Sequence, residues 1–401
     1  MTSTFARTPE RTSLRQRYGF ALLTYAFAAI MLGTTLPTPM YALYAEQMQF
    51  GVLTTTVVFA MYAGGVLLAL LAFGRWSDVL GRRPVLLGGA AAAIISAVVF
   101  LAARSVPELL VGRFFSGLSA GLFTGTATAA IIESAPPSWR TRAAAVATVA
   151  NIGGLGLGPL VAGILVEYAP APLQLSFVLH IVLVTLTVVA VSVAAETAQR
   201  GGTIGIQRLS IPPRTRAVFA VAATAAFAGF AVMGLFTAVA PSFISGVIGI
   251  DNHAAAGAIV ASVFAASAVS QVVAVRLDPS RAVAVGAAIL VLGMVLLAVA
   301  LSTSSLAVLV AAAIVAGVGQ GMSFSRGLAA VAEQTPAERR AEVNSAYFVV
   351  AYVAISLPVI GEGLAARQWG LQTAGVTFAV AVAVLAALCF VGVLVQERRR
   401  S

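Results

Sequence analysis

The chain has 401 residues, of which 60% are hydrophobic and only 9% are charged. A soluble protein of this length needs more charge to cover its surface, so this composition excludes the soluble globular classes. The net charge of +10 comes from arginines in short gaps between apolar runs, which argues against a nucleic-acid partner and for a protein embedded in the lipid bilayer.

Apolar windows of about 20 residues recur along the chain, each long enough to cross a bilayer core of about 30 Å as a helix. The first six helices are predicted at 19–43, 52–73, 84–103, 107–132, 143–167 and 172–195. The second six are predicted at 217–245, 253–275, 282–301, 305–331, 344–366 and 370–395. The sequence therefore predicts an all-α integral membrane protein with twelve transmembrane helices, the first of them too long for a cleavable signal.

A polar stretch separates the two sets of six helices. It holds Gly201-Gly202, Pro212-Pro213 and four arginines, a composition typical of linkers. We therefore expect an N-terminal bundle at 1–195, a cytoplasmic linker at 196–216 and a C-terminal bundle at 217–401.

The arginines also predict the orientation in the membrane. With both termini in the cytoplasm, twenty arginines lie inside and only Arg104 and Arg367 lie outside, while Arg113 and Arg326 fall within predicted spans. This bias follows the positive-inside rule. We expect a multi-pass protein of the bacterial inner membrane with both ends cytoplasmic.

The two halves align at an offset of 200 residues over long stretches without gaps. Charged and proline positions coincide as well as glycines, which chance similarity between alanine-rich helices would not explain. The matched pairs include Gly117 with Gly317, Glu133 with Glu333, Pro136 with Pro336, Arg140 with Arg340 and Gly163 with Gly363. Both halves start on the same side, so the pattern predicts two parallel six-helix pseudo-repeats that meet at a central cavity.

The run from Gly74 to Arg83 places three arginines and one aspartate between the second and third predicted spans. Asp278 lies in a second charged gap at the repeat offset, without the glycine-arginine pattern. The first run resembles the cytoplasmic loop signature of the major facilitator superfamily, and the six-plus-six layout extends this resemblance over the whole chain. The candidate conformational switch comprises Gly74, Asp78, Gly81, Arg82, Arg83 and Glu133.

The resemblance implies a role for each charge of this switch. Asp78 would face the positive N-terminal end of the helix that starts near Asn344, and the arginines would meet Glu133. A carboxylate at a helix N-terminus contributes about 0.3–1 kcal/mol when exposed and about 2 kcal/mol when partly buried. Contacts of this size can bias a two-state rocking equilibrium and still break in every cycle.

Small residues also mark the fifth predicted span. Gly154, Gly158, Pro159 and Gly163 resemble the glycine-proline motif of antiporters, and hence of exporters in the drug and sugar efflux branch. Ala162 stands where a glycine is usual in that motif. A helix that only packs against its neighbours is the alternative.

Arg113 in the fourth span looks like the buried arginine that the family associates with proton coupling, although Ser116 replaces a usual glutamine. It either faces a cavity or snorkels to the interface beside Glu108. For the lone mid-span histidine, simple packing is the alternative to a coupling role. The cavity or coupling candidates are Arg113, Arg326, His180, Glu362, Asn151 and Tyr41. Pro37 and Pro39 are expected to kink the first helix.

These features predict a secondary active transporter that exports small organic molecules by alternating access, with no enzymatic activity, cofactor or metal site. Arginines rather than carboxylates in the spans favour neutral or anionic cargo. The family resemblance implies a proton as coupling ion and a monomer. An importer or uniporter of a small metabolite is the alternative, and a membrane sensor or scaffold on the same fold is an alternative of another class.

Overall fold

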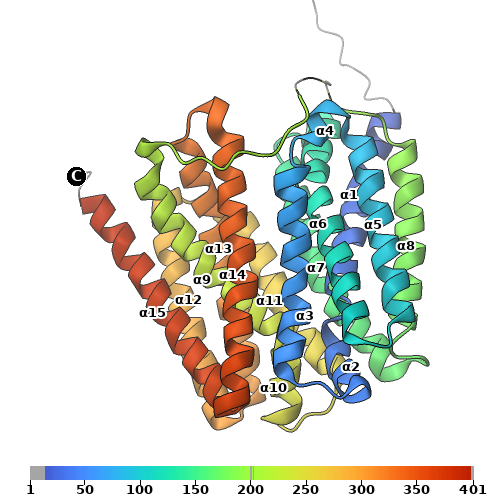
Figure 1. Ribbon diagram of the computed structural model, residues 1–401. Coiled ribbons are helices and arrows are strands. Elements are labelled where there is room, and N and C mark those ends of the chain that lie inside the picture. Colours follow the sequence, from blue (N-terminus) through green and yellow to red (C-terminus); the bar gives the residue numbers. More distant parts are fainter. Residues whose placement is uncertain (1–13, 199–200, 202, 399–401) are drawn as a thin grey trace, which may run out of the picture.

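The computed structural model describes residues 14–198, 201 and 203–398, and every regular element among them is a helix (Figure 1). The first half contains α1 (Leu14–Thr35), α2 (Tyr41–Met48), α3 (Val52–Ala72), α4 (Trp76–Val79), α5 (Arg82–Ala102), α6 (Val106–Ser134), α7 (Ala143–Tyr168) and α8 (Leu175–Val193). The second half contains α9 (Arg216–Ala238), α10 (Ala240–Gly246), α11 (His253–Ala274), α12 (Pro279–Thr303), α13 (Leu306–Glu333), α14 (Arg340–Trp369) and α15 (Leu371–Arg398).

Twelve helical segments in this described part are long and apolar enough to cross a membrane, which confirms the predicted number of spans. Their boundaries differ from the predicted ones by a few residues. The largest consequence is for α14, which extends to Trp369, so Glu362 lies seven residues from its end instead of the four expected. Five arginines of the orientation argument lie outside the described residues, namely Arg7, Arg11, Arg200, Arg399 and Arg400.

Prolines interrupt the first span, as predicted. α1 ends at Thr35, a 3-10 turn covers Thr38–Met40, and α2 continues the span. A second break, in the predicted helix 217–245, was not anticipated: this helix divides into α9 and α10. Pro241 in the first turn of α10 lacks the N–H that would continue the hydrogen-bonding of α9. The break lies 200 residues after the first one, so it follows the repeat.

Helices of the two halves form two groups that lie side by side, α1 to α8 in one and α9 to α15 in the other (Figure 1). We call the end of the molecule that carries α4 and the segment 203–215 the linker end, and the opposite end the far end. The halves meet where α7 contacts α11 and where α3 contacts α14.

Glycines bring these backbones together. A Cβ added to Gly257 of α11 would collide with the carbonyl oxygen of Pro159, and one added to Gly163 with that of His253. On the other side of the interface, a Cβ on Gly363 of α14 would collide with Thr56 of α3. Small residues at such crossings allow the close van der Waals packing that holds membrane helices together.

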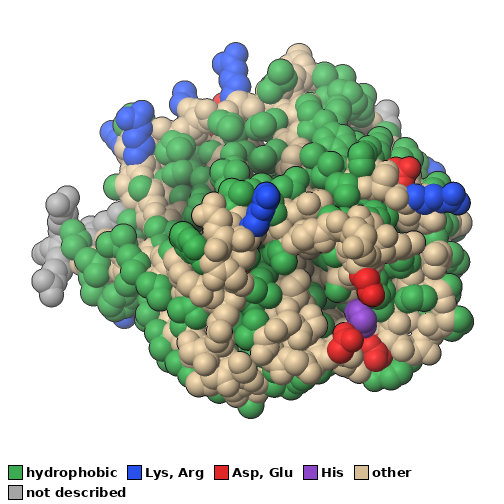
Figure 2. Space-filling view, turned by 60° about the horizontal axis from the view of Figure 1, so that its bottom comes forward, with side chains coloured by type: hydrophobic (Ala, Val, Ile, Leu, Met, Phe, Trp, Pro, Cys, Tyr) green, Lys and Arg blue, Asp and Glu red, His purple; other side chains and the backbone are tan. Residues whose placement is uncertain are grey.

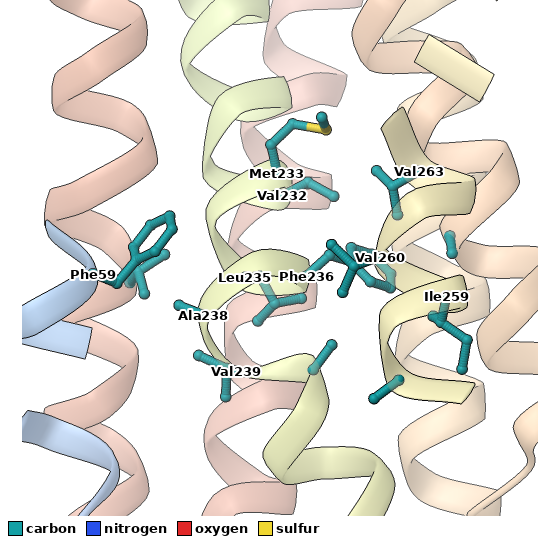
Figure 3. Close-up of a cluster of buried hydrophobic side chains, with 14 of the residues drawn as sticks. Phe59, Val232, Met233, Leu235, Phe236, Ala238, Val239, Ile259, Val260 and Val263 are labelled. Atoms are coloured by element: carbon teal, nitrogen blue, oxygen red, sulfur yellow. The ribbon is translucent and has the colours of Figure 1, made fainter. Parts of the chain in front are cut away.

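A buried apolar cluster also crosses the boundary between the halves. Figure 3 shows Phe59 of α3 beside Leu235 of α9 and Val239, which directly follows α9, with Val260 of α11 on the other side of α9. Phe59 is 3% exposed and Val239 fully buried. These residues lie in the far halves of their helices, so the two bundles are packed tightly toward the far end.

Candidate functional site

The predicted switch residues form a charged cluster at the linker end. The Arg82 guanidinium donates to Oδ1 of Asp78 at 2.6 Å and to Oε1 of Glu133 at 2.9 Å. It also donates to the Ser77 hydroxyl at 2.8 Å. One arginine therefore joins α4, α5 and α6. Gly81, with a φ of 108°, makes the turn between α4 and α5 in a conformation that favours glycine.

The remaining switch residues take different places. Arg83 is exposed, and it joins the cluster through its backbone N–H rather than through its guanidinium. A Cβ added to Gly74 would collide with the carbonyl oxygen of Leu70, so this position requires glycine where α3 ends. The expected pairing of an arginine with Glu133 is thus made by Arg82.

A cavity of about 700 Å³ opens beside this cluster. It is lined by Asp78 and Arg82 on one side, by Asn344 and Phe348 of α14 on the other, and by Gln207 of the linker. The Asp78 side chain is 62% exposed and pairs with Arg82. Its implied contact with the N-terminal end of α14 is not formed in this conformation, because the cavity lies between them.

Two further members of the cluster, Glu196 and Thr197, were not predicted from the sequence. The Glu196 carboxylate accepts the backbone N–H groups of Arg82 at 2.8 Å and Arg83 at 3.1 Å, which caps α5. The Thr197 hydroxyl donates to Oε2 of Glu133 at 2.6 Å. Only the position of Glu196 directly after the sixth span could have suggested such a role.

The electrostatics of Glu196 follow from these contacts. Desolvation by burial acts to raise its pKa, but the backbone N–H groups of Ala198, Arg82, Arg83 and Thr197 together lower it below the usual carboxyl value. The ionised carboxylate is therefore the form that caps the positive N-terminus of α5.

Arg113 is buried inside the N-terminal half, at 2% exposure. Its Nη1 donates to the carbonyl oxygen of Thr34 at 2.6 Å, and its guanidinium lies 4.8 Å from the ring centre of Tyr62. Glu108 instead completes a capping box with Ser105 at the start of α6. Of the two alternatives for Arg113, the structure therefore supports the buried arginine and not the snorkelling one. Its Nε has no hydrogen-bond partner among the described residues.

His180 and Tyr41 lie near the same stretch of α1. The ring of His180 packs where a Cβ on Gly33 would be, directly before the Thr34 carbonyl that Arg113 binds. Nε2 of His180 and the hydroxyl of Tyr41 are buried without partners in the described part of the chain. His180 and Tyr41 thus each carry a buried polar atom that is available to a ligand or a proton.

The other candidates are not joined to this group by any hydrogen bond or ion pair between described residues. Glu362 is 3% exposed in α14, and neither of its carboxylate oxygens has a partner there. It borders a small apolar cavity with Phe227 of α9 and Phe378 of α15. Arg326 is half-buried on α13 with an unpartnered Nε, and Asn151 is half-buried on α7.

The glycine-proline helix α7 uses its small residues on two faces. A Cβ added to Gly154 or Gly158 would collide with α1, whereas one added to Gly163 would collide with α11 of the other half. Pro159 leaves the carbonyl of Leu155 without its helical donor. The Thr35 hydroxyl of α1 supplies the missing hydrogen bond at 2.8 Å.

A carboxylate–histidine contact at the far end joins the two halves and was not predicted. Oε2 of Glu167, near the end of α7, accepts the backbone N–H of His253 at 2.8 Å and lies 3.1 Å from Nδ1 of the same residue. Figure 2 shows this face, with acidic side chains gathered around a histidine. The far end is thus held closed by polar contacts as well as by glycine packing.

Three comparisons with known proteins agree with this architecture. A sequence profile described as "Major Facilitator Superfamily" matches residues 20–357 and 225–401. A protein named "Multidrug transporter MdfA" of Yersinia pestis bv. Antiqua (strain Angola) is 32% identical over 167 residues, which is 41% of this chain and 40% of that protein. The protein of that name from Shigella boydii serotype 4 (strain Sb227) is 33% identical over 155 residues, 38% of this chain and 37% of that protein. These alignments span only about two fifths of the relatives' length.

Solved structures share the fold at low sequence identity. A bacterial homologue of the human lysosomal transporter Spinster, in an inward-facing and unoccupied conformation, superposes with a TM-score of 0.73 at 15% identity, covering 95% of this chain and 97% of that one. The human organic anion transporter MFSD10 superposes with a TM-score of 0.67 at 17% identity, covering 96% of this chain and 100% of that one.

Proposed function

The chain belongs to the Major Facilitator Superfamily, and from that premise we propose that it exports small organic molecules across the bacterial inner membrane, with both termini in the cytoplasm. Its family and relatives are membrane transporters rather than enzymes.

The observation that carries the proposal is the asymmetry between the two ends. A cavity of about 700 Å³ separates α14 from the switch cluster at the linker end, whereas Gly163, Gly363 and the Glu167–His253 pair close the far end. This arrangement is what an inward-open transporter requires. We propose that the halves 1–195 and 217–401, joined by the linker 196–216, rock about the central packing and so close the linker end.

The switch cluster would hold the closed state of the linker end. Asp78 is half in solvent on the wall of the cavity, and α14 begins on the opposite wall. When the halves approach, its carboxylate would reach the positive N-terminal end of α14 while Arg82 stays bound to Glu133. Gly74, Gly81 and Arg83 fix the turns that present it.

The proposed cargo is neutral or anionic. Arg113 is buried with a backbone carbonyl and aromatic rings as its partners and no carboxylate among the described residues within ion-pair distance. Such an arginine keeps an uncompensated positive charge, which attracts an anionic or strongly polar group. Arg326, half-buried with an unpartnered Nε, is the second candidate.

Proton coupling would use buried groups that can exchange a proton. Glu362 has no partner for either oxygen among the described residues, and an ionised carboxylate in such surroundings is costly unless it gains a cation. His180 and Tyr41 beside Arg113 are the other candidates. We propose that protonation of one of these groups is exchanged for cargo binding during the cycle.

Transport by everted membrane vesicles tests the proposal directly. With protons pumped into the lumen, so that an outward-directed proton gradient exists that an uncoupler abolishes, everted vesicles should accumulate neutral or acidic drugs more than a cationic dye. The Asp78→Asn variant should insert normally and lose most of this transport, while Asp278→Asn, matched by the repeat, should lose little. Accumulation only in right-side-out vesicles would favour the importer or uniporter, and preference for the cation would refute the cargo class.

A further inference from the structure

An apolar groove of about 830 Å³ runs along the boundary between the two halves, among α1, α7 and α11. Its walls include Val149, Gly153 and Leu157 of α7 and Ala265 and Val272 of α11. Val149 is 51% exposed and Leu157 47% exposed, as expected for side chains that face lipid. This groove is separate from the cavity at the switch and from the Arg113 group.

Two arginines stand at the linker end of the groove, one from each half. Arg142 precedes α7 and Arg276 follows α11, and both line the groove and are exposed. Neither forms a salt bridge with a carboxylate of the described chain. Trp139, whose ring lies 6.0 Å from the Arg142 guanidinium, completes this end. Tryptophan and arginine together are typical of the depth of lipid headgroups.

We propose that this groove binds one anionic phospholipid of the cytoplasmic leaflet. The phosphate would lie between Arg142 and Arg276, and an acyl chain would follow α7 toward Leu160. Basic pockets between transmembrane helices on the cytoplasmic side bind anionic headgroups in this way. From position 142 to position 160, α7 rises about 27 Å, enough for a chain that reaches the middle of a bilayer core of about 30 Å.

The glycines of α7 differ in a way that fits this site. A Cβ added to Gly154 would collide with α1, and one added to Gly156 would press against Phe264 of α11. In contrast, a Cβ on Gly153 would meet only a methyl group of Val149, at 3.9 Å. Gly153 is therefore not needed for helix packing, and its small size leaves the groove open.

The groove lies where the two halves meet, so a lipid bound in it would contact both halves. Its walls come from α7 of one half and α11 of the other, which meet at the interface. A lipid seated there contacts both halves at once in the inward-open state. Its placement in the cytoplasmic leaflet rests on the proposed topology, but the site does not depend on cargo, direction of transport or coupling ion.

Retention of lipid by the purified full-length protein tests the site. After delipidation, the protein is mixed with phosphatidylglycerol or phosphatidylcholine of identical acyl chains, and the lipid that remains bound is measured by native mass spectrometry. Wild type should retain phosphatidylglycerol preferentially. Each of Arg142→Gln and Arg276→Gln should weaken this retention about fivefold, the usual contribution of a basic residue at an anionic membrane surface.

A groove-filling variant tests the acyl part independently. Gly153→Phe keeps both arginines and should lower phosphatidylglycerol retention as strongly as loss of one arginine. Two matched controls should retain lipid like wild type: Arg281→Gln, an exposed arginine outside the groove, and Gly88→Phe, at a glycine of α5 with open space around it. All variants should elute as the same folded species on size exclusion.

Specific outcomes would overturn the proposal. Equal retention of the two lipids, or unchanged retention in the Arg142→Gln/Arg276→Gln double variant, would remove the headgroup site. Unchanged retention in Gly153→Phe would remove the acyl groove. Displacement of the lipid by millimolar inorganic phosphate would show a plain anion site, since a seated acyl chain should resist it.

Discussion

The Glu167–His253 pair at the far end offers the sharpest test of how the two halves are held. The carboxylate belongs to α7 of one half and the imidazole to the start of α11 of the other. Both side chains are 22% exposed, so solvent screens their contact only partly. We expect Glu167→Ala to weaken the closed far end and shift the protein toward its outward-open state.

The size of this shift follows from the two contacts that are lost. A carboxylate at a partly buried helix N-terminus contributes between about 0.3 and 2 kcal/mol. The contact between the two side chains adds about 0.2–1 kcal/mol when His253 is protonated. Together they give roughly 0.5–3 kcal/mol, which changes the ratio of inward-open to outward-open molecules by about 2-fold to 140-fold. Glu167→Gln should shift it less, because its amide oxygen can still accept the His253 N–H.

Distances between spin labels at the far end measure this ratio. Labels on cysteines at Gln47 of α2 and Gln368 of α14 would report one exposed position on each half, in a background with Cys389→Ala. Glu167→Ala should raise the population of the longer distance. Glu46→Gln, which removes another exposed carboxylate of α2, should leave the distribution unchanged. Identical distributions in wild type and Glu167→Ala would refute the reasoning.

Two further predictions concern stability. Because the pKa of Glu196 is lowered in the folded protein, its cap on α5 should stabilise fully above the ordinary carboxyl pKa of about 4.3 and be lost as the pH falls through the lower folded value. Thermal unfolding in detergent should therefore separate wild type from Glu196→Gln at pH 6, and the difference should narrow as the pH falls below the ordinary carboxyl pKa; a constant difference would contradict the cap. Thr35→Val should destabilise by about 1 kcal/mol, since it leaves the Leu155 carbonyl unpaired, and the loss should shrink in a Pro159→Ala background that restores the N–H. Additive losses in the double variant would count against this hydrogen bond.

The sequence alone predicts those features that depend on residues close together in the chain. Twelve apolar segments of bilayer length must become helices, because a backbone in lipid has to satisfy its own hydrogen bonds. The switch loop could be predicted from the sequence for the same reason. Asp78, Gly81 and Arg82 lie within five residues of one another, so a single turn of the chain brings them into contact.

Several site residues could not be read in this way. Nothing near Glu196 in the chain shows that it caps a helix that starts 114 residues earlier. The partner of Arg113 is the backbone carbonyl of Thr34. Because every residue has such a carbonyl, the residue type at position 34 does not predict this hydrogen bond. Nothing in the sequence shows that His253 contacts Glu167, which lies 86 residues earlier in the chain.

What the sequence determined by itself is the number of spans, their pairing into two repeats and the charged turn at one end, because length, hydropathy and short-range charge decide these. Tertiary structure alone decided which end is open, how the linker caps the switch and where the halves touch. Those features depend on helices that cross at glycines such as Gly163 and Gly257, far apart in the chain, and the crossing angle of two helices is a property of their packed surfaces rather than of either sequence.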